Sequence, residues 1–363
     1  MIPPTDIVDL FAGPGGWSLA AAVLGLNELG IEFERWACTT RHAAGFRTIH
    51  ADVATLNPSN FRAAGLIASA PCQAFSTAGR GHGRDLVPEL MEAIDARNWA
   101  ARPDPDPRVW LVLEIGRWVE AMRPEWVALE QVPAVLPLWD RYAAWLRELG
   151  YHTWCGILNA TDYGVPQTRR RAVLMAHRRH LVAAPHATHA RDPIPSLFVT
   201  PEPWVTMADA LGWQGRVGFP RVDDRGDSPD GYRERDWRSC TEPAATVTEK
   251  ARSWQLSPGE NRKGRRAYDL DEPAPTLAFG HNSAAWKWTL HTGRNSGEQT
   301  VDTNAIRITP QEALILQSFP PSYPVQGTKT RQFEQIGNAV PPLLAWHILR
   351  ALVDPQELVK NSP

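Results

Sequence analysis

Short apolar runs alternate with stretches of helical periodicity along the first half of the chain. The apolar runs lie at 6–11, 66–70 and 124–129. The stretches in which apolar residues recur at helical spacing lie at 17–26, 109–122 and 138–149. Runs that are apolar on both faces are typical of buried strands in a parallel sheet, so the alternation predicts an α/β fold.

The pattern changes after about residue 177. Prolines, glycines and tryptophans become more frequent, and long helical patterns disappear up to about residue 305. We expect this stretch to form a smaller, mainly β or irregular domain, in which 241–248 resembles 271–277. Helical signals then return. Thr309, Pro310 and Glu312 predict a capped helix start, and 343–353 is an apolar helix.

Composition narrows the class of protein. The 363 residues are enough for two domains, and no apolar run approaches the length of a membrane span. The start of the chain lacks the basic and apolar regions of a signal peptide, so we expect a cytoplasmic protein. The four cysteines are scattered and form no CxxC pair, so neither a disulfide framework nor a metal site is predicted. A net charge of −2 is compatible with a local basic cleft for nucleic acid.

A glycine turn follows the first apolar run and precedes the first helical stretch. It contains Gly13 and Gly15, and the order strand, glycine turn, helix is that of a nucleotide-type βαβ unit. Glu32 follows about twenty residues later, where a ribose hydroxyl pair is bound, and Phe33 beside it could stack on a purine. Asp52 could accept a hydrogen bond from an adenine amino group. Their ordinary interpretations are a tight turn, a solvated charge and a helix cap.

Cys72 stands in the loop after the apolar run at 66–70, at the edge where open α/β sheets place their ligand chemistry. A lone cysteine there is either a small buried hydrophobe or a nucleophile. Glu130 ends the run at 124–129 and therefore lies on the same sheet edge. The segment 74–105, which contains several glycines and prolines, is either a mobile lid over Cys72 or a surface insertion.

A further polar group stands at the start of a later apolar strand. Alternation along 167–176 puts Gln167, Arg169 and Arg171 on one face of this strand. Arginines that enter an apolar strand are costly unless they are paired or bind a ligand. They are therefore either pocket residues or a solvated ladder of charges on an edge strand.

Six segments occur in a fixed order through the chain. They are Asp-Leu-Phe-Ala-Gly-Pro-Gly-Gly at 9–16, Pro-Cys-Gln at 71–73, Glu-Gln-Val at 130–132, Gln-Thr-Arg-Arg-Arg at 167–171, Arg-Ile-Thr-Pro-Gln-Glu at 307–312 and Gln-Ile-Gly-Asn-Ala-Val at 335–340. Together they resemble the motif series of the cytosine-C5 DNA methyltransferases of bacterial or phage type. The resemblance implies a Rossmann-like class I methyltransferase fold, S-adenosylmethionine as methyl donor, no metal, and double-stranded DNA as substrate.

The same resemblance implies how the chain divides into domains. Residues 1–176 plus 306–353 would form the catalytic domain, 177–305 the target-recognition domain, and 354–363 a tail. The catalytic domain is then discontinuous, because the last helix returns to complete it. We expect a monomer, since one target base per active site needs no second subunit. A role in restriction–modification or in phage DNA modification would make a cognate restriction endonuclease a genetic rather than a physical partner.

Residue roles carry over from the motifs. The donor site would be formed by Phe11, Gly13, Gly15, Glu32, Phe33, Asp52 and Asn338. Within it, Glu32 would hold the ribose hydroxyls, Phe33 would stack on the adenine, and Asp52 would bind its amino group. Cys72 would be the nucleophile and Glu130 would contact the cytosine ring. The base would be positioned by Gln167, Arg169 and Arg171.

The chain departs from the family pattern in three places. Gln131 stands where the family usually has Asn, Ala70 stands where Gly is common, and 74–105 is longer than in compact bacterial members. Two other functions remain open. One is a tRNA cytosine-C5 methyltransferase on the same scaffold, against which the long recognition segment favours DNA. The other is a non-catalytic DNA-binding homologue, against which an intact Cys72 and Glu130 favour an enzyme.

Overall fold

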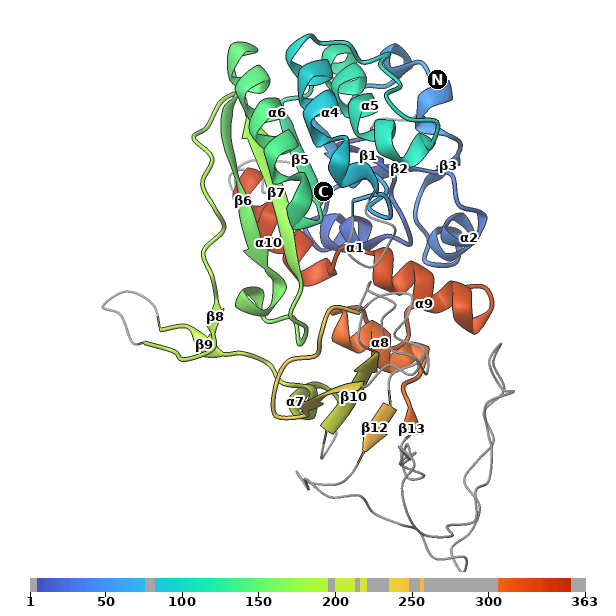
Figure 1. Ribbon diagram of the computed structural model, residues 1–363, viewed down its shortest axis with the longest axis vertical. Coiled ribbons are helices and arrows are strands. Elements are labelled where there is room, and N and C mark those ends of the chain that lie inside the picture. Colours follow the sequence, from blue (N-terminus) through green and yellow to red (C-terminus); the bar gives the residue numbers. More distant parts are fainter. Residues whose placement is uncertain are drawn as a thin grey trace, which may run out of the picture.

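The computed structural model describes residues 5–75, 82–194, 200–212, 216–220, 235–247, 255–257 and 306–353. Its larger sheet has seven strands in the order β3-β2-β1-β4-β5-β7-β6 and lies in the upper part of the view in Figure 1. Its strands are β1 (Ile7–Leu10), β2 (Glu28–Glu32), β3 (Thr48–His50), β4 (Gly65–Ala68), β5 (Trp126–Gln131), β6 (His152–Asn159) and β7 (Arg170–His177). Strands β1 to β5 are parallel, and β7 runs antiparallel to β5 and β6. The predicted Rossmann-like α/β fold is confirmed.

The register of the parallel strands brings their carboxyl ends to one level. Leu10 of β1 pairs with Ile31 of β2 and with Ala68 of β4, and Ala68 pairs with Leu129 of β5. The residue that follows each of these therefore lies at the same edge of the sheet. This edge carries Phe11, Glu32, Ser69 and Glu130.

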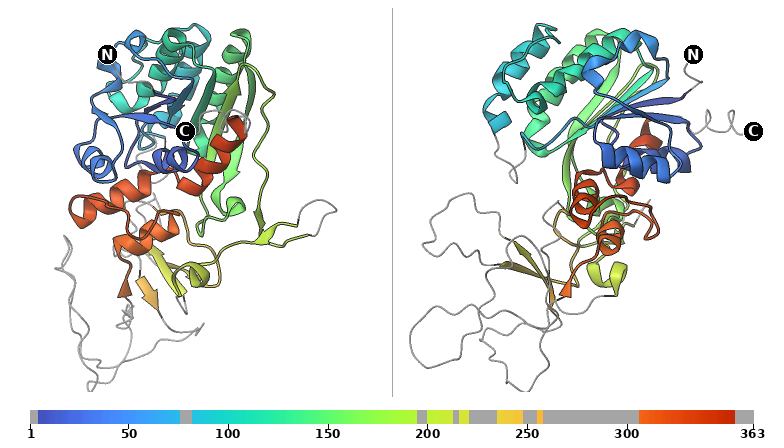
Figure 2. Two further views of the ribbon diagram at one scale, coloured as in Figure 1. Left: turned by 180° about the vertical axis from the view of Figure 1, so that it is seen from behind. Right: turned by 90° about the vertical axis from the view of Figure 1, so that its right-hand side faces the viewer.

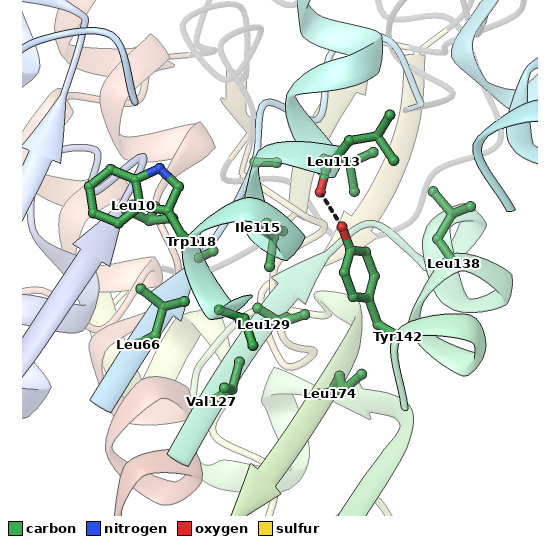
Figure 3. Packing of buried hydrophobic residues seen from close by; sticks show 14 of the residues in the cluster. Leu10, Leu66, Leu113, Ile115, Trp118, Val127, Leu129, Leu138, Tyr142 and Leu174 are labelled. Carbon is green, nitrogen blue, oxygen red and sulfur yellow. Dashed lines mark hydrogen bonds between the residues drawn. The ribbon is translucent and has the colours of Figure 1, made fainter. Parts of the chain in front are cut away.

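Helices cover both faces of the sheet (Figure 2). On one face lie α1 (Gly16–Val23) and α10 (Pro342–Leu352), and on the other lie α4 (Val87–Asp95), α5 (Pro107–Met122) and α6 (Leu136–Glu148). Strand residues alternate between these layers, because Ile67 joins the buried cluster of α1 and α10 whereas Leu66 joins that of α4 to α6. Figure 3 shows the latter cluster around Trp118 and Tyr142.

Further helices lie along the chain between these strands and helices. They are α2 (Arg35–Ala43), α3 (His82–Asp85) and the 3-10 helices η1 (Val53–Thr55), η2 (Pro58–Asn60), η3 (Pro133–Val135) and η4 (Ala160–Tyr163). The turn before α10 approaches α1 so closely that a Cβ at Gly16 would collide with the carbonyl oxygen of Val340. Glycine at this position therefore permits the end of the chain to pack against its beginning.

None of the helices within the described ranges is long and apolar enough to span a membrane.

A smaller set of elements follows β7. It contains β8 (His189–Ala190), β9 (Glu202–Pro203), α7 (Met207–Leu211) and a four-stranded antiparallel sheet with the order β11-β10-β12-β13. The strands of this sheet are β10 (Arg216–Pro220), β11 (Arg235–Ser239), β12 (Gln255–Ser257) and β13 (Ile306–Arg307). The predicted domain limits stay a prediction. Strand β13, which the prediction placed in the catalytic domain, pairs with β12 of the small sheet.

Helices α8 (Pro310–Leu316) and α9 (Lys329–Asn338) lie between the two sheets (Figure 1). The predicted start of α8 is confirmed as a capping box. The Thr309 hydroxyl accepts from the Glu312 backbone N–H at 3.2 Å, and the Glu312 carboxylate accepts from the Thr309 backbone N–H at 2.7 Å.

The segment that follows the Cys72 loop is folded over much of its length. Residues 82–95 contain α3 and α4, and Leu90 and Ile94 of α4 are buried against α5 and α6. Trp99 packs into the space left by Gly116 of α5. The expectation that 74–105 lies outside the core is therefore wrong for 82–99, because Leu90, Ile94 and Trp99 anchor this part to the core. Residues 76–81 lie outside the described ranges.

Candidate active site

The loop after β1 follows a left-handed backbone path. Phe11 has a φ of 61°, and Gly13 and Gly15 have φ values of 56° and 108°. Glycine adopts such angles freely, whereas Phe11 does so with strain. A Cβ at Gly13 would meet no atom within 4 Å, so this glycine borders open space. A Cβ at Gly15 would lie 2.8 Å from the Tyr323 hydroxyl, so Gly15 serves close packing instead.

Glu32 closes this loop from the end of β2. Its carboxylate accepts from the backbone N–H of Gly13 at 2.7 Å and from that of Glu34 at 2.6 Å. Burial raises the pKa of Glu32, and these two backbone hydrogen bonds act in the opposite direction. The carboxylate is thus held in one orientation, and each oxygen keeps a lone pair for a ligand hydroxyl.

Three more predicted donor-site residues border the same space. Phe33 is 72% exposed beside Glu32, so one face of its ring is open to a ligand. Asp52 caps η1 by accepting from the Ala54 backbone N–H at 2.9 Å. Its predicted roles as a helix cap and as an adenine ligand are compatible, because a carboxylate has several acceptor sites. Asn338, the last residue of α9, reaches this space from the C-terminal part of the chain.

Cys72 lies in the loop after β4. Its carbonyl oxygen accepts from the Phe75 backbone N–H at 3.0 Å, which makes the turn after the cysteine. Gln131 at the end of β5 donates from Nε2 to the carbonyl oxygen of Ala70 at 2.6 Å. The other end of the same amide accepts from the Val132 backbone N–H at 2.7 Å. The side chain of Gln131 therefore links β5 to the loop that carries the cysteine.

Glu130 and Arg171 form an ion pair on neighbouring strands. Glu130 Oε1 lies 2.8 Å from Arg171 Nε, and the two side chains are 7% and 10% exposed. Arg171 also donates from Nη1 to the carbonyl oxygen of Arg170 at 2.7 Å. A pair this well screened from water keeps a defined geometry, so each partner orients the other.

Arg169 is buried where three distant segments meet. Its Nη1 donates to the carbonyl oxygens of Gly337 at 2.9 Å and Val247 at 3.3 Å. Burial lowers the pKa of the Arg169 guanidinium and the neighbouring Arg171 lowers it further, yet the group remains a cation. Within the part of the chain that is described, Nε of Arg169 has no hydrogen-bond partner. A buried donor of this kind is available to an acceptor on a ligand.

These charges act on the thiol of Cys72. Burial raises the pKa of Cys72, whereas Arg171 and then Arg169 lower it, and Glu130 raises it. The two arginines therefore favour the thiolate against the effect of burial. Burial outweighs the two arginines, so the pKa of Cys72 lies above its ordinary value, and the arginines supply the positive charge that favours a cysteine nucleophile.

One cavity of about 1750 Å³ joins the two groups of residues. The predicted site residues in its wall are Phe11, Gly13, Glu32, Phe33, Asp52, Cys72, Glu130, Arg169, Arg171 and Asn338. Single small-molecule pockets measure about 300 to 1,000 Å³. This cavity therefore has room for two ligands side by side, one against Glu32 and one against Cys72.

Comparisons with known proteins identify the family of this chain. The family model for C-5 cytosine-specific DNA methylases matches residues 5–354. The chain belongs to this family. Membership confirms the predicted enzyme class, a DNA cytosine-C5 methyltransferase, and implies S-adenosylmethionine as methyl donor.

Individual relatives are distant but similar over most of their length. The Type II methyltransferase M.DdeI of Desulfomicrobium norvegicum is 25% identical over 94% of this chain and 86% of its own. M1.HphI of Haemophilus parahaemolyticus is 26% identical over 95% of this chain and 86% of its own. The solved structure of the Entamoeba histolytica methyltransferase EhMeth shares the fold, with a TM-score of 0.58 and 14% identity across 97% of this chain and 98% of that one.

The donor end of the cavity fits the methyl donor of this family. The open space at Gly13 admits a ligand close to the backbone, and the Glu32 carboxylate can accept from a pair of ribose hydroxyls. The exposed ring of Phe33 offers a stacking surface for adenine. Among the described residues, no group of three or more His, Cys, Asp or Glu side chains is placed to hold a metal ion.

Gln167 does not line the cavity, although the sequence predicted that it positions the base. Its Oε1 accepts from the Val247 backbone N–H at 2.6 Å, and its Nε2 donates to the carbonyl oxygen of Leu316 at 3.1 Å and to Gln317 Oε1. Gln317 in turn donates to the carbonyl oxygen of Ile336 at 2.6 Å. Gln167 therefore joins Val247 to α8 and, through Gln317, to α9. Gly15 also lies outside the described wall, because it caps α1.

The cavity wall also contains residues that sequence reasoning did not single out. Ala245 and Thr246 reach it from the segment that follows β11, and the Thr246 hydroxyl donates to the carbonyl oxygen of Thr168 at 2.7 Å. Arg331 and Glu334 of α9 form an ion pair at 2.6 Å in another part of the wall. The internal similarity of 241–248 to 271–277 marked the first pair as part of a motif but indicated no role.

Proposed function

We propose that the chain transfers a methyl group from S-adenosylmethionine to C5 of a cytosine in double-stranded DNA, with Cys72 as the nucleophile. The observation that supports this most directly is the shared cavity, in which Cys72, Glu130 and Arg171 border the donor residues. Methyl donor and nucleophile must reach the same base, and a shared cavity permits both to do so.

Cytosine C5 becomes reactive only after attack at C6. The thiolate of Cys72 forms a bond to C6, and the displaced electron pair of the C5–C6 double bond makes C5 an enamine carbon. C5 then takes the methyl group, loses its proton, and restores the double bond as the thiolate leaves. Arg171 and Arg169 support the first step because they lower the pKa of the Cys72 thiol, which burial raises.

The ring gains electron density at N3 and O2 during this attack. Glu130 would share a proton with N3, and its ion pair with Arg171 at 2.8 Å holds the carboxyl in place for that contact. Nε of Arg169 would donate to O2, which would give this buried group the partner that the described residues do not supply. Preorganised donors of this kind stabilise charge that develops in the transition state.

The donor would be held by Glu32, Phe33, Asp52 and Asn338. Once bound, it supplies a methyl group on a positively charged sulfur. Glu32 would orient the ribose through its two carboxylate oxygens, which the backbone of Gly13 and Glu34 already fixes.

The target base must leave the duplex to reach Cys72. Extrusion of a base costs a few kcal/mol, which contacts in the pocket must offset. Ala245 and Thr246 belong to the predicted target-recognition domain and line the cavity wall, so base extrusion and sequence reading would occur next to one another. Because M.DdeI and M1.HphI are Type II methyltransferases, we further propose that this chain modifies a specific DNA site alongside a restriction endonuclease.

A trapping experiment tests the proposal. Duplexes of mixed sequence that contain 5-fluorocytosine are incubated with the protein and labelled S-adenosylmethionine. Fluorine at C5 blocks the final elimination, so the protein should remain covalently attached to DNA through Cys72. Cys72→Ser removes the proposed nucleophile. The matched control is Cys240→Ser, which removes a buried cysteine that lies outside the described cavity wall.

Three outcomes separate the alternatives. A donor-dependent adduct that Cys240→Ser retains and Cys72→Ser loses supports the proposed reaction, and sequencing the trapped sites gives the specificity. An adduct with fluorinated tRNA but not with duplex DNA would replace DNA by RNA as the substrate. Folded protein that binds the donor and traps neither nucleic acid would contradict the proposal.

A further inference from the structure

Two loops at neighbouring strand ends serve different parts of the proposed reaction. The donor loop, residues 11–16, follows β1, and the nucleophile loop, residues 69–73, follows β4. These strands are adjacent, with Leu10 of β1 paired with Ala68 of β4. The methyl group must therefore cross from a ligand held by one loop to a base held by the other.

A side-chain hydrogen bond connects the two loops. Trp17, which follows the donor loop in the first turn of α1, donates from Nε1 to the Ser69 hydroxyl at 3.0 Å. Trp17 is 2% exposed, so water hardly competes for its N–H. The Ser69 backbone N–H also donates to the carbonyl oxygen of Leu10 at 3.3 Å. Ser69 is thus held by β1 and by α1 at the position where the nucleophile loop begins.

We propose that Trp17 is a positioning residue that sets the separation of the donor loop and the nucleophile loop through Ser69. The inference rests on the proposed function, because it concerns the distance between the donor methyl group and C5 of the cytosine bound to Cys72. Ser69 belongs to the described cavity wall and Trp17 does not. Trp17 therefore acts through Ser69 and touches no ligand itself.

The two halves of the reaction differ in their sensitivity to this separation. Methyl transfer is an in-line displacement, in which a misplacement of about 1 Å can lower the rate about a hundredfold. Attack of Cys72 on C6 needs only the nucleophile loop and the base pocket. Without the donor, C5 of the adduct can take a deuteron from heavy water, lose its original proton and release the thiolate. Exchange at C5 therefore reports on the nucleophile loop and the base pocket, and not on the donor loop.

Three single variants and one double variant test the inference. Trp17→Phe removes the N–H that donates this hydrogen bond but keeps an aromatic ring. Ser69→Ala removes the hydroxyl that accepts it, with little change of volume. The control is Trp99→Phe, because Nε1 of Trp99 donates to Glu120 Oε2 at 2.9 Å in the segment packed on α5, outside the described cavity wall. Each protein is assayed for the rate of methyl transfer and for the rate of exchange at C5 without the methyl donor. Both rates are divided by the number of active sites, which is counted by trapping with 5-fluorocytosine DNA.

We expect Trp17→Phe and Ser69→Ala each to lower the methyl-transfer rate about tenfold and to leave C5 exchange within about twofold of the original protein. The double variant should be no slower than the slower single variant, because both remove the same bond. Trp99→Phe should leave the ratio of the two rates unchanged.

Other results would overturn the inference. If Trp17→Phe lowered both rates alike, or if Trp99→Phe changed their ratio equally, Trp17 would have only a packing role. Additive effects in the double variant would show that no shared bond is involved. If Trp17→Phe fails to fold, Ser69→Ala alone decides, since unchanged methyl transfer in it contradicts the inference. Absence of both reactions in the original protein would instead contradict the proposed function.

Discussion

The donor end and the base end of the cavity are built in different ways. At the donor end, Glu32 is fixed by backbone N–H groups of Gly13 and Glu34, which lie close to it in sequence or one strand away. At the base end, Arg169 is held by carbonyl oxygens of Val247 and Gly337, which lie 78 and 168 residues further along the chain. The donor end depends on local backbone geometry, whereas the base end depends on the assembly of distant segments.

The two ends also differ in charge. Glu32 and Asp52 bring carboxylates to the donor end, whereas Arg169 and Arg171 lie with Glu130 and the Cys72 thiol at the base end. Ribose hydroxyls and the adenine amino group are donors, and a cytosine ring under attack gains negative charge. Each end is therefore complementary to its proposed ligand, and substitutions should separate donor affinity from the chemistry on the base.

The largest separation is expected from Cys72→Ala. Methyl transfer should fall by at least about a thousandfold, because the covalent step is lost. The donor should still bind within about twofold, since the thiol is not part of the donor end. Single-turnover kinetics and calorimetry of donor binding measure the two quantities. A variant that kept most of its methyl-transfer rate would exclude Cys72 as the nucleophile.

Glu130→Gln should have the next largest effect. It removes the group that shares a proton with N3, so the rate of methyl transfer should fall by about a hundredfold to ten-thousandfold. Donor affinity should again stay near its original value. Glu120→Gln, in the same fold but away from the described cavity wall, is the control for removing one negative charge. Equal losses in the two variants would contradict a specific role for Glu130.

Glu32→Gln should change the opposite end. Loss of a charged acceptor for the ribose hydroxyls should weaken donor binding by about tenfold to a hundredfold. Exchange at C5 without the donor should be nearly unchanged, because the nucleophile loop and base pocket remain intact. Calorimetry and deuterium exchange measure these effects. If donor affinity stayed the same while exchange fell, the assignment of the two ends would be reversed.

The smallest change is a shift in pH dependence. Arg171 is the strongest of the groups that lower the pKa of the Cys72 thiol, so Arg171→Gln should raise that pKa. The thiolate then forms at higher pH, and the rate of alkylation of Cys72 by iodoacetamide should rise at higher pH than in the original protein. Arg171→Lys keeps the charge and should shift the profile less. A shift toward lower pH in Arg171→Gln would contradict the proposed electrostatics.

The insertion after Cys72 shows how local signals can mislead. Glycines and prolines predicted either a mobile lid or a surface insertion over 74–105, but the structure packs 82–99 onto α5 and α6 through Leu90, Ile94 and Trp99. The deciding feature is Gly116, which stands in a different helix and leaves space for the Trp99 ring. Contacts of this kind connect residues that no local pattern relates.

Gln131 is a similar case. The sequence showed that Gln131 replaces the Asn usual in the family, which adds one methylene to the side chain. The structure shows that its amide still reaches the carbonyl oxygen of Ala70 at 2.6 Å. The replaced residue is visible in the sequence, whereas its partner is decided by the pairing of β4 with β5, which brings the Cys72 loop beside it.

The sequence alone determined the fold class, the capped start of α8 and most of the proposed site residues that the structure places in one cavity. Buried strands, glycine turns and helix caps depend on neighbouring residues, so their patterns are readable along the chain. Strand order, which only pairing between distant segments establishes, decided that Cys72, Glu130 and Arg171 meet in one cavity. Tertiary packing likewise placed Gln167 behind the site instead of in it, because a buried amide takes its partners from whichever backbone groups surround it.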